Sequence, residues 1–167
     1  GRALAHRRSE YVLATKVGEH CDRAGSKYDY SAAATRGFID ESLRRLRTDH
    51  IDLLQIHSAS IEVLERGETW AAMDEARRAG KARFLGMTGH VDSAIRAIEI
   101  GGYDTVQVPY HLLNVDAAER LFPLAEERGV GVLIMRSLAG GKLTAKFERH
   151  ADAAVRDAVR SFLELTP

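Results

Sequence analysis

The sequence predicts an α/β fold with a parallel sheet, of the (β/α)8 TIM-barrel type, present here as an incomplete barrel of about five strands. Two observations lead to this fold class. Short apolar runs alternate with amphipathic segments along the chain, and parallel strands require such long connections between them. Several of the apolar runs also deliver a polar side chain near their carboxyl ends, which is how a parallel barrel presents functional groups.

The predicted strands are short apolar runs bounded by glycine or polar residues. They cover residues 11–17, 51–57, 82–88, 105–110 and 130–135. The predicted helices carry apolar side chains at helical spacing, and Ser31, Asp92 or Ser93, Gly80 and Gly129 are suitable residues for their ends. These helices cover residues of about 32–47, 62–79, 94–99, 117–128 and 151–165.

We expect a single domain over residues 1–167, because no linker or low-complexity segment divides the series. A complete barrel has eight strands and typically takes about 250 residues. The predicted strands and the length of 167 residues fall short of that, and residue 1 is not Met. We therefore expect the sequence to be cut at both ends.

Composition sets broad limits on partners. The 24 basic side chains balance 24 acidic ones, so no global charge draws the chain to nucleic acid or to an anionic membrane. No stretch approaches the roughly 18 apolar residues of a membrane span, and the single Cys21 cannot form an internal disulfide. We expect a cytoplasmic protein that binds a small neutral or anionic molecule. The sequence leaves the oligomeric state open.

Two ionisable residues stand at the ends of neighbouring predicted strands. Lys16 lies near the end of the first apolar run, and His57 closes the second. Alternate strand residues face the same way, so both side chains are expected at one mouth of the barrel. Taken singly, Lys16 could be a strand-end lysine that extends to solvent, and His57 a hydrogen-bonded core histidine. Polar residues at the ends of the later strands favour a functional site instead.

The chain resembles the aldo-keto reductase family over almost its whole length. The matching segments, in chain order, are ATK at 14–16, ESLRRL at 41–46, TDHIDL at 48–53, QIH at 55–57, GK at 80–81, FLG at 84–86 and LAGG at 138–141. No single segment is decisive, but their order and spacing together indicate the family.

The resemblance implies an oxidoreductase that transfers hydride from NADPH to the carbonyl of an aldehyde or ketone. The family's catalytic tetrad is an Asp, a Tyr, a Lys and a His, and the resemblance places the last two on Lys16 and His57. The Asp and Tyr precede the Lys, in a segment that this chain lacks, and none of its tyrosines matches the proton-donor position. We therefore expect the isolated chain to reduce aldehydes at no more than background rate.

The resemblance also implies a cofactor site, with NADP as the family expectation. The Ser-Asn pair and the Gln that hold the nicotinamide map to Thr88, Gly89 and Gln107, and Gly89 lacks the amide side chain for its contact. Met135 replaces an aromatic residue that often stacks on the nicotinamide, and it can offer a polarizable contact. A role as a core methionine is an equal alternative for Met135.

The loop after the fifth predicted strand contains the ingredients of a pyrophosphate site: backbone N–H groups, a hydroxyl and two cations. The residues concerned are Arg136, Ser137, Leu138, Gly140 and Lys142. Without the family match, an ordinary glycine-rich turn would be the simpler interpretation. No GxGxxG motif follows the first strand, so a Rossmann-type site is not supported.

Other functions stay open. The replacement at Gly89 and the missing Asp and Tyr fit a non-catalytic nucleotide-binding or interaction protein on the same fold. His57, His90 and His111 at successive strand ends would fit a barrel metallohydrolase, but no HxH or HExxH motif is present and we expect no metal. A partial barrel would also expose strand edges and apolar surface, so a fragment that self-associates without independent function is the third alternative.

Overall fold

The structure is a computed structural model that describes residues 3–23, 25–144, 147–149 and 152–165. Its centre is a five-stranded sheet in the order β1-β4-β5-β6-β7, with every neighbouring pair parallel. These strands are β1 (Ala14–Val17), β4 (Ile51–His57), β5 (Ala82–Thr88), β6 (Thr105–Pro109) and β7 (Gly131–Met135). A separate antiparallel hairpin, β2 (Glu19–Asp22) and β3 (Gly25–Tyr28), follows β1 along the chain.

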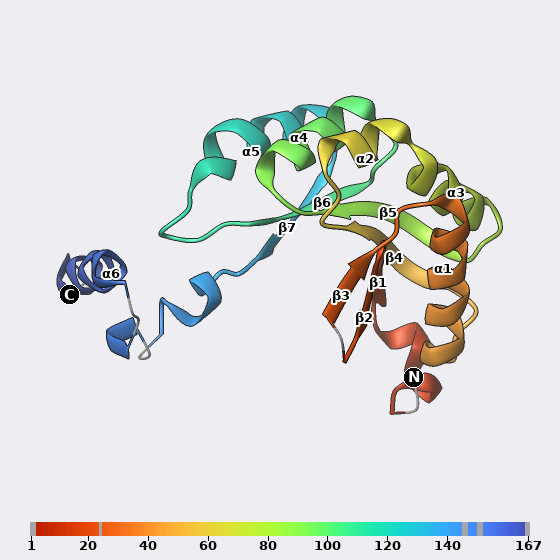
Figure 1. Cartoon of the computed structure of the whole chain (residues 1–167), viewed down its shortest axis with the longest axis horizontal. Coiled ribbons are helices and arrows are strands. Elements are labelled where there is room, and N and C mark those ends of the chain that lie inside the picture. Colours follow the sequence, from red (N-terminus) through yellow and green to blue (C-terminus); the bar gives the residue numbers. More distant parts are fainter. Residues whose placement is uncertain (1–2, 24, 145–146, 150–151, 166–167) are drawn as a thin grey trace.

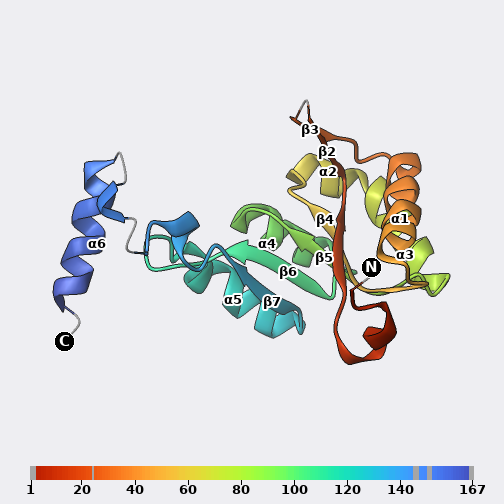
Figure 2. The same ribbon diagram turned by 90° about the horizontal axis from the view of Figure 1, so that it is seen from below.

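The sheet is curved, and the helices that connect its strands cover its outer face (Figure 1). They are α1 (Ala32–Leu46), α2 (Ile61–Arg66), α3 (Glu68–Arg78), α4 (Val91–Ile100) and α5 (Asp116–Arg128). A last helix, α6 (Ala153–Leu165), stands apart from the sheet beyond β7 (Figures 1 and 2). Short 3-10 turns are η1 (Ala5–Glu10), η2 (Ala139–Gly141) and η3 (Phe147–Arg149). No helix in the described part of the chain is both long and apolar enough to cross a membrane.

The hydrophobic core lies between the sheet and its helices. Val17, Leu54, Leu85 and Val106 come from four neighbouring strands, and each is 0% exposed. Leu121 of α5 is equally buried against them as part of the same cluster. Burying a side chain of this size stabilises a fold by about 1.5–3 kcal/mol, so this face determines how the sheet is oriented.

The opposite face of the sheet is open. Phe84 is 48% exposed and Leu133 is 39% exposed, although both side chains are large and apolar. In a closed barrel this face would be the filled interior. β1 and β7 form the two edges of the sheet. The predicted α/β class is confirmed, and the open inner face is consistent with an incomplete (β/α)8 barrel.

Most predicted elements are present, with changes at their ends. β4 and β5 have the predicted bounds, and the hydroxyl of Ser31 caps α1 by accepting a hydrogen bond from the N–H of Ala34 at 3.2 Å. β1 is shorter than predicted, because the chain before it follows η1, where Arg8 binds the carbonyl oxygen of Tyr11 at 3.1 Å. β6, α5 and β7 each differ from prediction by one residue at one end. The predicted start of the last helix, residue 151, lies outside the described residues.

Three predictions about elements were wrong. The helix predicted over 62–79 is two helices, because Gly67 adopts a left-handed φ of +71° between them. α4 begins at Val91 with His90 as its N-cap, so neither Asp92 nor Ser93 caps it. The segment between β1 and α1, where no strand was predicted, contains the β2–β3 hairpin.

One buried carboxylate ties the amino-terminal end of the sheet together. Asp52 on β4, with a side chain 6% exposed, accepts hydrogen bonds from Arg8 at 2.7 Å, from the N–H of Leu13 at 2.9 Å and from Arg83 at 2.7 Å. Burial alone would raise the pKa of Asp52, but these hydrogen bonds outweigh it and hold the pKa well below its ordinary value. The contact joins the segment before β1 to β4 and β5.

We predict that Asp52→Asn lowers the free energy of unfolding by about 1–3 kcal/mol at neutral pH, because Arg8 and Arg83 lose their anionic partner. Since the folded pKa of Asp52 is lowered, its contribution is fully present above the ordinary Asp pKa of about 3.9 and is lost as the pH falls below that value. Urea unfolding of wild type and variant from neutral to acidic pH measures both effects.

The matched control for this experiment is Asp40→Asn, which removes an exposed ion pair with Lys81 and should change stability by less than about 1 kcal/mol. The stability difference between wild type and Asp52→Asn should shrink in acid. A difference that stays constant down to the lowest pH at which the protein folds would contradict the assignment.

Candidate functional site

Polar side chains gather at the carboxyl edge of the sheet, on its open inner face. The parallel register pairs His57 with Thr88, and Thr88 with Gln107. Two residues nearer the amino end of β4, Gln55 pairs with Lys16 of β1. Residues paired in register, or two positions apart on a strand, face the same side of a sheet. The structure therefore brings four residues predicted from the sequence, Lys16, His57, Thr88 and Gln107, to one face and one edge.

Two amide side chains on this face contain buried atoms that lack a partner. Nε2 of Gln55 and Oε1 of Gln107 are buried, and neither has a hydrogen-bond partner among the described residues. An unsatisfied buried polar atom costs about 1–3 kcal/mol and calls for a partner from water or a ligand. Lys16, beside Gln55 in register, is exposed. The inner face thus offers amide groups and a cation to a polar ligand.

His57 is held by a carboxylate that the sequence analysis missed. Nδ1 of His57 contacts Oε2 of Glu19, and the two side chains are 31% and 18% exposed. Side chains of Ser26 and Tyr28 on β3 bind the same carboxylate. The bond from Ser26 is the largest cause of a lowered pKa at Glu19, against the opposing effect of burial. The hairpin, which projects beyond the sheet in Figure 2, thus brings an anion to the end of β4.

Tyr30 fastens the segment after the hairpin to β4. Its hydroxyl donates a hydrogen bond to the backbone carbonyl of His57 at 2.8 Å, and its own carbonyl accepts one from the hydroxyl of Thr69 at 2.5 Å. Its ring stacks on that of Tyr28, with centroids 6.1 Å apart. Burial, helped by the charges of Tyr28 and Glu19, raises the pKa of Tyr30 to about 12. Tyr30 is therefore a protonated donor at neutral pH.

Thr88, Gly89 and Met135 lie together where β5 and β7 end. The hydroxyl of Thr88 donates to Sδ of Met135 across 3.8 Å, and the N–H of Gly89 donates to the carbonyl of Gln107 at 3.0 Å. A Cβ added to Gly89 would lie 2.7 Å from Cε of Met87, so a side chain at position 89 requires Met87 to move. Gly89, which lacks the side chain expected to contact the cofactor, therefore leaves the space that Met87 occupies.

Residues 136–142 form a tight turn around η2. The N–H groups of Ala139, Gly141 and Lys142 donate to carbonyls inside the turn at 2.6, 2.8 and 3.4 Å. These three donors are used within the loop, which leaves its other N–H groups and the side chains of Arg136, Ser137 and Lys142 for an anion. Arg136 and Ser137 are exposed at the end of β7.

Backbone in the left-handed region recurs at this edge. Ser58, directly after His57, has a φ of +51°, and Arg136, directly after β7, has a φ of +56°. Gly140 adopts a φ of +67° in the same loop, where Leu138 is 57% exposed. A non-glycine residue in this region costs about 1–3 kcal/mol, and such residues cluster at ligand sites.

The described residues do not assemble a metal site. Within the described ranges, no group of three His, Cys, Asp or Glu side chains could hold an ion. His90 is the N-cap residue of α4, and His111 uses Nδ1 to accept the N–H of Leu113 at 3.2 Å. The geometry gives the metallohydrolase alternative no support.

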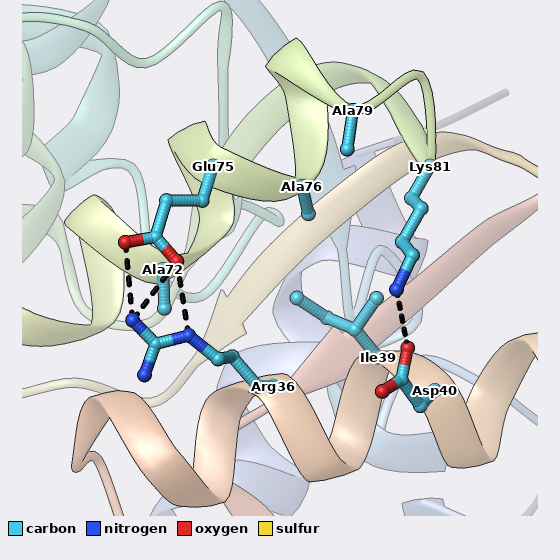
Figure 3. Close-up of a pocket in the computed structure, with 8 residues that line it drawn as sticks. All are labelled: Arg36, Ile39, Asp40, Ala72, Glu75, Ala76, Ala79 and Lys81. Carbon is cyan, nitrogen blue, oxygen red and sulfur yellow. Dashed lines mark hydrogen bonds and ion pairs between the residues drawn. The ribbon is translucent and has the colours of Figure 1, made fainter.

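A separate groove lies on the helix side of the sheet, between α1 and α3 (Figure 3). Arg36 pairs with Glu75 at 2.9 Å, and Lys81 pairs with Asp40 at 2.7 Å, so its charged side chains bind one another. None of the residues predicted from the sequence as site residues lines this groove. The candidate site is therefore the carboxyl edge of the sheet.

Comparison with known proteins identifies the family. A model of the aldo/keto reductase family matches residues 1–166. The chain is 34% identical over 150 residues to L-galactose dehydrogenase of Arabidopsis thaliana, a match that covers 86% of this chain and 46% of that protein. It is 28% identical over 155 residues to the NADH-specific methylglyoxal reductase of Escherichia coli, with coverage of 85% and 48%.

Among solved structures, the chain is similar to the holo form of an aldo-keto reductase from Bacillus halodurans, with a TM-score of 0.78 and 32% identity over 86% of this chain and 49% of that one. The chain spans about half the length of the curated relatives it matches. The parallel five-stranded sheet with alternating helices is the architecture of a barrel-type α/β protein, here incomplete. The family match is more specific: the chain belongs to the aldo/keto reductase family, as its sequence indicated.

A prediction follows for Gly18, which joins β1 to the hairpin. Its φ is +99°, and an added Cβ would lie 2.5 Å from Cε1 of Tyr30. We predict that Gly18→Ala lowers the free energy of unfolding by about 1–3 kcal/mol, because the left-handed backbone is strained and the Tyr30 ring must move. Urea denaturation measures the change.

Gly37→Ala is the matched control for Gly18→Ala. Gly37 lies inside α1, and an added Cβ there would meet open space. The exchange should raise stability by up to about 1 kcal/mol, the difference in helix propensity between Gly and Ala. Equal effects of the two exchanges would mean that Gly18 does not set the position of Tyr30.

Proposed function

We propose that the carboxyl edge of this sheet is the cofactor and substrate site of an oxidoreductase that transfers hydride from NADPH to an aldehyde or ketone. The observation that carries the proposal is the continuous parallel register, through which Lys16, His57, Thr88 and Gln107 reach the same face and edge. Membership of the aldo/keto reductase family supports it. We also propose that the protein acts on a small carbonyl compound in the cytoplasm.

The nicotinamide end of the proposed site is formed by β5, β6 and β7. The buried Oε1 of Gln107, which lacks a partner among the described residues, fits the amide N–H of a carboxamide. Thr88 stands next to it in register and offers a hydroxyl, and the N–H of Gly89 already fixes the adjacent backbone. Met135, in contact with Thr88, offers a polarizable surface to a flat ring. When bound, the reduced cofactor supplies the hydride.

The phosphate end of the proposed site is the turn after β7. Arg136 and Lys142 supply positive charge and Ser137 supplies a hydroxyl, while Leu138 and Gly140 shape the turn that presents them. Charge-assisted hydrogen bonds to phosphate oxygens are roughly twice as strong as neutral ones. In this proposal, Arg136, Ser137 and Lys142 bind the phosphates of the dinucleotide at the turn after β7, away from the reacting end of the site.

The reacting end of the proposed site is formed by β1 and β4. His57 would orient the carbonyl oxygen of the substrate by a hydrogen bond. Lys16 would act as the cation that, in the family's tetrad, lowers the pKa of the phenol that donates the proton. Lys16 is exposed on the inner face, which leaves its ammonium group accessible to such a partner.

Cofactor preference is part of the proposal. One relative is named an NADH-specific methylglyoxal reductase, so NADPH is not the cofactor of every relative. We infer NADPH from the family resemblance of the sequence. Parallel titration with NADPH and NADH tests this, and tighter binding of NADH would overturn the preference for NADPH.

We predict saturable binding of NADPH to the purified chain, measured by cofactor fluorescence, and about ten- to hundredfold weaker binding by Lys142→Ala. Losing one charge-assisted hydrogen bond to a phosphate costs about 1.5–3 kcal/mol, and each 1.4 kcal/mol is a factor of ten in affinity. Lys81→Ala, which removes a lysine from the groove on the helix side, is the matched control and should bind like wild type.

Absence of saturable binding would contradict the proposed site, as would equal loss in both lysine variants. Tight NADPH binding by a protein that supplies every member of the tetrad, without reduction of any aldehyde or ketone, would instead favour the non-catalytic nucleotide-binding alternative. The Asp and Tyr that the chain lacks, together with the glycine at position 89, motivate that alternative.

A further inference from the structure

The contact between Glu19 and His57 joins two separate parts of the fold. Glu19 begins β2, and His57 ends β4 in the central sheet. Oε2 of Glu19 meets Nδ1 of the ring, and both side chains are mostly buried. A carboxylate bound to one ring nitrogen of a histidine fixes both the orientation of the ring and the position of its proton.

Glu19 is itself held in place from the other strand of the hairpin. β2 and β3 pair in the register Glu19 with Tyr28 and Cys21 with Ser26, which puts the two hydroxyl groups beside the carboxylate. The hydrogen bond from Ser26 lowers the pKa of Glu19 most, burial opposes it, and the charge of His57 and the bond from Tyr28 add to the lowering. Glu19 is therefore an ionised carboxylate at neutral pH and can only accept hydrogen bonds.

The backbone of His57 is fixed independently of its ring. Tyr30 donates to the carbonyl of His57 at 2.8 Å and is anchored in turn by Thr69. Because the main chain is held by Tyr30 and the ring by Glu19, removing the carboxylate should free the ring without moving the strand. This separation makes the role of Glu19 testable by a single substitution.

An ionised carboxylate at Nδ1 has a chemical consequence at Nε2. The acceptor keeps a proton on Nδ1, so the neutral ring presents a lone pair at Nε2. A carbonyl oxygen is an acceptor as well and needs a donor. The ring can then donate from Nε2 only after it takes up a second proton.

We propose that Glu19 is a positioning residue that holds the Nδ1–H form of His57, so that this histidine can bind a carbonyl oxygen only as the imidazolium. The functional half of this statement rests on the proposed function, because it takes the ligand of His57 to be a substrate carbonyl.

Other groups face this pair from the neighbouring elements. Lys16 on β1 shares the inner face and opposes a second positive charge. Tyr28 on β3 binds the same carboxylate, and the negative charge of Glu19 is the main cause of a raised pKa at Tyr28, so that phenol stays neutral. Thr88 on β5 pairs with His57 in register and carries no charge. Glu19 is thus the anion that sets the proton position on the ring.

The test is nitrogen NMR of the histidine rings in the complete 167-residue chain, without any cofactor. The His57 signals are assigned by their loss in His57→Gln. In wild type, the neutral ring of His57 should show the pattern of protonated Nδ1 and unprotonated Nε2. In Glu19→Ala this pattern should be lost in favour of Nε2–H, because Nδ1–H then lacks its carboxylate acceptor. Glu19→Asp should restore it at least in part.

Glu10→Gln is the matched control, because Glu10 pairs with Arg7 on the exposed surface and should leave the His57 signals unchanged. A wild-type ring protonated on Nε2 when neutral would overturn the proposal, and this result needs no variant to fold. An unchanged proton position in a folded Glu19→Ala would do the same. The readout uses no NADPH, so failure of cofactor binding would count against the proposed function alone.

Discussion

The parallel register of the central sheet is the constraint on which both the core and the candidate site depend. Side chains alternate between the two faces of a strand, so a slip of one residue would turn every polar group to the wrong side. Burial of Leu54 and Val106 against the helices fixes the register of their strands. The same register carries His57 and Gln107 to the inner face. In each strand, the apolar side chains buried against the helices therefore position the polar side chains on the opposite face.

The hairpin after β1 adds a second, electrostatic constraint. Gly18 lies against the ring of Tyr30, whose hydroxyl binds the carbonyl of His57 on β4. Glu19 follows Gly18 directly and begins β2. Without this hairpin the ring of His57 would lack its bond to a carboxylate. The sheet thus sets where His57 lies, and the hairpin sets the orientation of its ring.

The parts that were predictable from sequence are those controlled by local signals. The bounds of β4 and the cap at Ser31 follow from an apolar run and from a hydroxyl that accepts a backbone N–H. The break at Gly67 was missed, because the apolar spacing continues through it and only the backbone angle reveals the interruption. Glu19 was missed for a different reason. Its partner His57 is distant in sequence, and the local signal for a hairpin was weak: a glycine, Gly25, at the start of β3.

The central claim is that the carboxyl edge of the sheet, and no other surface, receives a nicotinamide dinucleotide. Backbone amide NMR during titration with NADPH tests it most directly. The account predicts saturable shifts concentrated at Thr88, Gly89, Gln107 and the turn 136–142, with little change along α1 and α3. Shifts centred on the groove between those two helices, or shifts that never saturate at any position, would contradict it.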